Sequence, residues 1–183
     1  MQLRRLAATA VAFAAASSLA ACGSSEEPTV GKTEGVYVTT GELKYQVQIS
    51  RQLNAADFED RDYLKGVPDR LSRGEEWFAV FIRVFNQSKA AHPSASQFSI
   101  KDTTGRTFQP VQVDLNTNVV AYRPLTVRPG DQIPVPGSVA RENATQGGMI
   151  LFKIPVASYA NRPLELHIAP PEGGQEATVD LDV

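Results

Sequence analysis

Downstream of residue 35, glycine and proline interrupt the chain at short intervals, and this feature limits the fold most strongly. The whole sequence holds 13 glycines and 12 prolines in 183 residues. A helix that packs on a core needs a long apolar stripe with a period of 3.6 residues, whereas a strand needs only about four to eight residues. Turn residues between short apolar runs therefore predict an all-β chain.

Two segments carry the clearest strand patterns. Residues 43–50 alternate between apolar and polar side chains from Leu43 to Ile49, as in a half-buried strand. Residues 77–85 (WFAVFIRVF) are apolar on both faces except at Arg83, which indicates a central strand covered on both sides. Further strands are predicted at 36–40, 97–101, 106–113, 119–127, 149–154, 164–168 and 179–183.

The remaining segments are less regular. Two prolines place residues 132–139 at a sheet edge or outside the sheet, because proline cannot donate a ladder hydrogen bond. Residues 54–66 lack alternation and begin at Asn54, a residue that can cap a helix, so a short helix or helical turn is predicted near 55–64. Seven or more short strands with regular turns predict an antiparallel β-sandwich with one short helical insertion. A closed β-barrel is the alternative.

The first 22 residues have the pattern of an export signal. Arg4 and Arg5 precede an uncharged apolar stretch that is too short to span a bilayer. The sequence Leu-Ala-Ala-Cys that ends at Cys22 resembles the lipobox of bacterial lipoproteins. That resemblance implies cleavage before Cys22, a diacylglycerol thioether on its sulfur, and acyl chains such as palmitate in the membrane. An ordinary secreted protein with a chance cysteine is the alternative.

These signals divide the chain into three parts: a lipoprotein signal peptide at 1–21, the lipidated cysteine with a flexible tether at 22–35, and one β-sandwich domain at 36–183. The expected location is the cell membrane, with the protein lipid-anchored at its extracytoplasmic face. The mature chain would hold 16 basic against 20 acidic side chains. Because no basic block stands out, we expect no nucleic acid partner.

Several short motifs occur in an order that resembles a known family. They are Gly74–Val80, Val84–Ser88, Phe98–Asp102, Gly105–Phe108, Leu125–Gly130 and Leu151–Pro155. The order is similar to an Ig-like domain of unknown function that is common in Gram-positive and actinobacterial lipoproteins, and that resembles a secreted mycobacterial immunogenic protein in fold. The resemblance implies an immunoglobulin-like sandwich outside the cell and carries no catalytic residues. The 54–74 segment is long for this family.

The side chains that chemistry would require are sparse, so we expect no catalytic residues, no cofactor and no metal site. His92 and His167 are interpreted as solvated surface residues, since no nucleophile motif accompanies either one. The acids between Asp57 and Asp62 depart from the calcium-loop pattern and are interpreted as a solvated face.

Three aromatic residues of the 77–85 strand, Trp77, Phe81 and Phe85, share one face, and Phe78 lies on the other. The favoured interpretation is that residues 54–66 cover the three. Alternatively, they line a ligand groove or a partner surface.

These observations predict a non-catalytic binding or interaction module of the cell envelope. We expect it to be held at the membrane by its N-terminal lipid and to bind an unidentified envelope protein. A carrier or sensor of a small apolar ligand is the first alternative, and an envelope hydrolase is the second.

Overall fold

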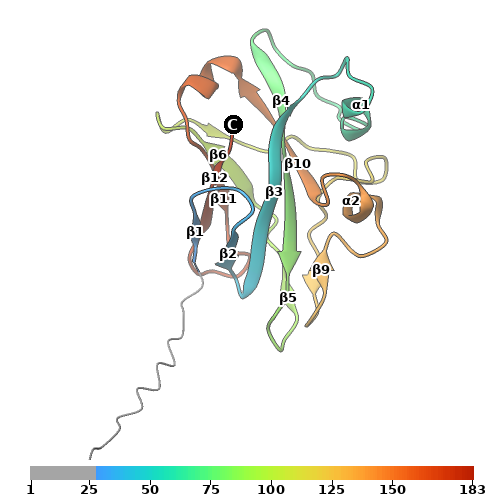
Figure 1. The fold of residues 1–183 in the computed structure, drawn as a ribbon, viewed down its shortest axis with the longest axis vertical. Helices are drawn as coiled ribbons and strands as arrows, with labels where there is room; N and C mark the ends of the chain where they lie inside the picture. Colours follow the sequence, from blue (N-terminus) through green and yellow to red (C-terminus); the bar gives the residue numbers. More distant parts are fainter. Residues whose placement is uncertain (1–27) are drawn as a thin grey trace, which may run out of the picture.

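The computed structural model of the protein describes residues 28–183, so the expected signal peptide and Cys22 lie outside the described residues. The described chain forms two facing β-sheets (Figure 1). The first sheet, called sheet A, has five strands. In spatial order they are β1 (Val30–Gly31), β12 (Ala177–Leu181), β11 (Leu164–Ile168), β6 (Phe98–Lys101) and β7 (Thr107–Phe108).

The second sheet, called sheet B, is built around two long antiparallel strands. Its path runs β10 (Gly148–Pro155), β4 (Glu75–Phe85), β3 (Leu43–Leu53) and β2 (Tyr37–Thr40), and β9 (Gln132–Ile133) pairs with the end of β4. A separate two-stranded ladder joins β5 (His92–Pro93) to β8 (Thr126–Val127). The prediction of an all-β sandwich is confirmed.

The main core fills the space between the two sheets. Alternate side chains of β4, from Phe78 to Val84, meet Ile100 of β6 and Leu166 of β11, and all of them are almost fully buried. Burial of this apolar surface is the dominant contribution to stability, at roughly 25 cal/mol per Å² of apolar area removed from water.

A second hydrophobic cluster covers the other face of sheet B. Trp77, Ala79 and Phe81 of β4 pack there with Met149 and Leu151 of β10. They are covered by residues 63–67, 111–121 and 139–142, which we call the outer layer. Strands β4 and β10 are therefore buried on both faces along most of their length, as the sequence predicts for residues 77–85. Figure 1 shows α1 and α2 on this side of the molecule, away from β11 and β12.

The predicted alternation of strand β3 is wrong at Ile49. Its pairing with β4 shifts register between Val47 and Ile49, which marks a bulge. A bulge inserts one extra residue and reverses which side chains face the core beyond it. Ile49 was expected on the buried face, but it points outward and is 39% exposed, while Ser50 lies inside.

The predicted helical segment is shorter than expected. Helix α1 spans Asp60–Tyr63, within the predicted 55–64 range. Asp60 is buried, accepts a hydrogen bond from the Asn54 backbone N–H at 2.7 Å, and pairs with Arg51. The expectation of a wholly solvated acidic face is therefore wrong at Asp60. Two further short helices were not predicted, namely α2 (Val139–Glu142) and the 3₁₀ helix η1 (Val156–Ala160).

The expected flexible tether is partly folded. Val30 and Gly31 pair in parallel with Thr178 and Val179 of β12, and the Thr39 backbone N–H donates to the Pro28 carbonyl at 2.9 Å. The part of the 22–35 segment that the structure describes therefore belongs to the sandwich. Among residues 28–183, no helix has the length and apolar character needed to cross a bilayer.

A turn at residues 102–105 joins β6 to β7, and the two strands pair antiparallel. The Asp102 carboxylate accepts hydrogen bonds from the Thr104 hydroxyl at 2.6 Å and from the Arg106 Nε–H at 2.8 Å. Burial by itself would raise the pKa of Asp102. Its hydrogen bonds with Thr104 and Arg106 outweigh burial and lower that pKa below the ordinary value of 3.8.

We predict that Asp102→Asn lowers the free energy of unfolding near neutral pH. Because the pKa of Asp102 is lower in the folded state than in the unfolded chain, its stabilisation is present above 3.8 and is lost as the pH falls below that value. Urea unfolding across the acid range should therefore show the difference between wild type and variant shrinking. The exposed Asp62→Asn serves as control, with an expected change of at most about 0.5 kcal/mol. A difference for Asp102→Asn that stays constant down to about pH 2 would contradict this account.

Candidate functional site

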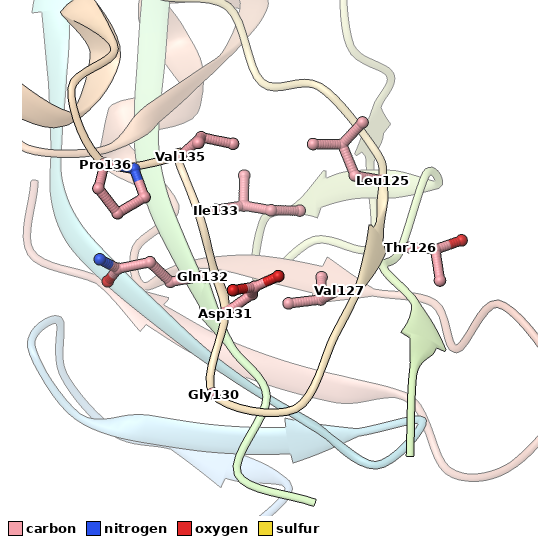
Figure 2. Close-up of a pocket in the computed structure, with 9 residues that line it drawn as sticks. All are labelled: Leu125, Thr126, Val127, Gly130, Asp131, Gln132, Ile133, Val135 and Pro136. Atoms are coloured by element: carbon pink, nitrogen blue, oxygen red, sulfur yellow. The ribbon is translucent and has the colours of Figure 1, made fainter. Parts of the chain in front are cut away.

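A partly apolar hollow lies where the chain turns between β8 and β9. Residues 125–127 and 131–136 form two arms joined by a turn in which the Asp131 N–H donates to the Arg128 carbonyl at 2.9 Å. Figure 2 shows Leu125, Val127 and Ile133 pointing into the space between the arms, whereas Thr126 points away. This hollow, which we call the 125–136 groove, has a volume of about 170 Å³.

Apolar side chains remain exposed on and beside the groove. Leu125 and Val135 on its arms are 45% and 52% exposed. Ile133 and Val135 also line a smaller apolar hollow that continues toward Val119 and Ala140 of the outer layer. Scattered exposed apolar residues are ordinary on a protein surface, but a contiguous set around a hollow is typical of a binding surface.

Buried polar side chains fix the two arms in place. The amide Nδ2 of Asn86 donates to the carbonyls of Ala90 and Val127, each at 2.7 Å. The Asn86 backbone N–H donates to the Asp131 carbonyl at 3.1 Å, and its carbonyl accepts from the Gly130 N–H at 2.9 Å. One residue immediately after β4 therefore ties both arms of the groove to sheet B.

The 125–127 arm is also anchored to the loop before β6. The Ser94 backbone N–H donates to the Leu125 carbonyl, and the Ser94 Oγ accepts from the Leu125 N–H at 3.0 Å. The Tyr122 hydroxyl donates to the Ala95 carbonyl at 2.9 Å, and the Tyr45 hydroxyl accepts from the Ala95 N–H at 2.8 Å. Burial raises the pKa of Tyr45 to about 12, so its hydroxyl stays protonated in this network.

Asn118 performs a similar role in the outer layer. Its Nδ2 donates to the carbonyls of Tyr63 and Lys65 at 2.8 and 2.9 Å, and its Oδ1 accepts from the backbone N–H groups of Val120 and Ala121. The groove thus rests on backbone segments that are held by hydrogen bonds on a fixed sheet. Such pre-organisation lowers the entropy cost of binding.

The three aromatic residues singled out in the sequence have different surroundings. Trp77 and Phe81 are buried under the outer layer, and the Tyr63 ring meets the Phe81 ring edge-on at 5.1 Å. Residues 54–66 contribute to this cover, together with 111–121 and 139–142. Phe85 is half-buried and contacts the Tyr37 ring at 5.6 Å. Trp77 and Phe81 are therefore buried and line no open surface in the described part of the chain.

The two histidines lie in different ladders. His92 is half-buried on β5, opposite Val127. His167 on β11 is only 7% exposed, so the expectation of a solvated residue is wrong for it. Its Nδ1 contacts the carboxylate of Glu176, and its Nε2 lies 2.8 Å from a carboxylate oxygen of Glu165. These carboxylates screen His167 from water, which no local sequence pattern indicates.

The surroundings of His167 limit the chemistry of this imidazole. Each ring nitrogen faces its own carboxylate, and Nδ1 also lies 3.5 Å from the Lys101 Nζ, so neither nitrogen is hydrogen-bonded to a serine or threonine hydroxyl of residues 28–183. The two carboxylates also lie at opposite ring nitrogens, so they cannot converge with one nitrogen on a single ion. Within residues 28–183, no group of three or more acidic, histidine or cysteine side chains has an arrangement that could hold a metal.

The sequence matches no family model and no curated protein. Among solved structures, the chain is similar to the yjhA protein from Bacillus subtilis, with a TM-score of 0.57 and 12% identity over 82% of this chain and 99% of that one. The secreted protein MPT63 from Mycobacterium tuberculosis gives a TM-score of 0.49 at 16% identity, over 85% of this chain and 99% of that one. The match to ycdA, a candidate lipoprotein of Bacillus subtilis, has a TM-score of 0.48 and 11% identity. It covers 80% of this chain and 38% of that one. At these identities the yjhA match shows a shared fold.

Proposed function

We propose that the protein is a non-catalytic binding module of the cell envelope, lipid-anchored through Cys22 at the extracytoplasmic face of the membrane. It binds an envelope protein through the 125–136 groove. The observation that carries this proposal is the set of apolar side chains left half-exposed on both arms of the groove, although the arms themselves are tied down by Asn86 and Ser94.

The geometry of the groove favours an extended apolar segment of a partner protein. Strand β9 pairs with β4 and, within residues 28–183, with no other strand. An edge strand beside apolar pockets can bind a peptide through main-chain hydrogen bonds, while the pockets select its side chains. Leu125, Ile133 and Val135 supply such pockets here.

The two alternative functions receive less support from the geometry. A small-ligand carrier would use Trp77 and Phe81, which are covered, and ligand pockets usually enclose about 300–1,000 Å³, which exceeds the groove. A hydrolase that used His167 as its base would need a free ring nitrogen, and both of its ring nitrogens already face carboxylates.

We predict that Cys22→Ala moves the protein from the detergent-rich phase to the aqueous phase when cells are extracted with a phase-separating detergent. The reason is that two acyl chains anchor a protein stably, and this variant cannot receive them on the sulfur. Immunoblots of both phases make the comparison. If wild type and variant both partitioned into the detergent phase, the proposal of a lipid anchor at Cys22 would be refuted.

We predict that a photoreactive phenylalanine analogue in place of Val135 captures one dominant envelope protein in living cells. The same analogue in place of Val156 is the matched control, because Val156 is an apolar residue of similar exposure on the distant helix η1. Adding Leu125→Asp to the Val135 variant should weaken capture at least about tenfold, since a buried apolar side chain contributes roughly 1.5–3 kcal/mol.

Mass spectrometry of the captured bands identifies the partner. Leu125 is half-exposed, so its substitution should leave the melting temperature almost unchanged, which separates loss of binding from loss of folding. Equal capture from positions 135 and 156, or capture that Leu125→Asp leaves intact, would refute the groove as the binding surface.

A further inference from the structure

A half-buried arginine lies on the outer face of β4 just beyond the second hydrophobic cluster. Arg83 follows Phe81 on the same strand face, and its guanidinium lies 4.6 Å from the centre of the Phe85 ring. One terminal nitrogen donates to the Gln132 side-chain carbonyl at 2.9 Å. Its Nε–H is buried and has no hydrogen-bond partner within the described residues. A buried donor left unpaired costs free energy, so its position needs an explanation.

A second arginine approaches it from helix α2. Helix α2 contacts strand β10, and its Ala140 belongs to the same outer-face cluster as Phe81 and Met149, so the next residue, half-buried Arg141, lies on the face of sheet B that carries Arg83. The two positive charges affect one another. Burial lowers the pKa of Arg83, and the charge of Arg141 lowers it further.

No carboxylate of the described residues neutralises this pair. Among residues 28–183, neither Arg83 nor Arg141 has an acidic oxygen within the 4.0 Å of an ion pair, and Arg141 shows no side-chain hydrogen bond. Two other half-buried cations are paired, Arg51 with Asp60 and Lys153 with Asp69, the latter at 2.7 Å. Two neighbouring like charges, one of them partly desolvated, are costly unless an anion lies between them.

We propose that Arg83 and Arg141 form a binding site for a phosphate group. A guanidinium presents planar donors that match phosphate oxygens, and two of them match the double charge of a phosphate. The unpaired Nε–H of Arg83 becomes a donor to one oxygen. The rings of Tyr37 and Phe85, which meet edge-on at 5.6 Å, border the site and offer an apolar wall for the carbon body of a phosphoester. The site adjoins the 131–136 arm of the groove through Gln132, but it does not use Leu125, Ile133 or Val135, which supply the proposed partner contact.

The test is a titration of the purified full chain with inorganic phosphate, followed through the arginine Nε–H signals in ¹H–¹⁵N spectra. Sodium chloride at equal ionic strength serves as the baseline. The Arg83 Nε–H signal, assigned by its loss in Arg83→Lys, should shift and saturate with phosphate. Arg141→Gln should weaken this binding at least about tenfold, because a hydrogen bond between charged groups contributes enough to change an affinity by that factor.

A matched control uses Arg73→Gln. Arg73 is exposed and precedes β4, ten residues before Arg83, so at about 3.3 Å per residue it lies far from the site. Phosphate binding unchanged in Arg73→Gln and lost in Arg141→Gln, with the backbone spectrum intact in both, supports the site. A shift that does not saturate, or that persists in Arg141→Gln, overturns it.

Lipid vesicles distinguish a lipid headgroup from a soluble phosphate as the natural ligand of the site. Arg141→Gln should reduce binding to phosphatidylglycerol vesicles, relative to phosphatidylcholine vesicles, if a lipid headgroup is the natural ligand. Vesicle binding unaffected by Arg141→Gln, together with saturable binding of inorganic phosphate, assigns the site to a soluble phosphate or phosphoester.

Discussion

Burial of β4 on both of its faces is the interaction on which the rest of the structure depends. One set of its side chains, including Phe78 and Val80, fills the space between the sheets, and the other set, Trp77, Ala79 and Phe81, supports the outer layer. Without the inner set there is no sandwich. Without the outer set, residues 111–121 and 139–142 have no apolar surface on which to pack. The arms of the groove continue from these residues and would then lose their support.

Buried amides and hydroxyls hold the segments that pack on sheet B in defined positions. Asn86 and Asn118 each bridge segments that are far apart in sequence, and both are almost completely buried. A satisfied buried amide holds backbone groups in one arrangement, because an unpaired buried donor or acceptor costs about 1–3 kcal/mol. Residues 125–136 therefore keep apolar side chains exposed on a fixed backbone, which is the arrangement expected of a binding surface rather than of a loose loop.

The sequence predicted the sandwich because period-two alternation and the doubly apolar 77–85 strand follow from local rules. It also predicted that residues 54–66 cover Trp77, Phe81 and Phe85. The structure supports this in part, because Tyr63 and Leu64 help to cover the first two, whereas Phe85 lies against Tyr37. It did not predict the bulge after Val47, since one extra residue leaves no compositional sign. The groove and the burial of His167 were missed as well. Both depend on contacts between distant segments, such as the Asn86 amide with the Val127 carbonyl, and these have no local pattern.

Hydrogen–deuterium exchange of Tyr63→Ala tests the central claim that the outer layer is a separate layer held on the outer face of β4. Tyr63 packs on Phe81 at 5.1 Å from the outside, so its loss removes a contact of the layer and leaves the core between the sheets intact. The account predicts faster exchange in residues 60–67 and 111–121, with the protection of β3 and β4 unchanged. Exchange that accelerates equally in β4 would show that the two layers are one cooperative unit and would contradict the account.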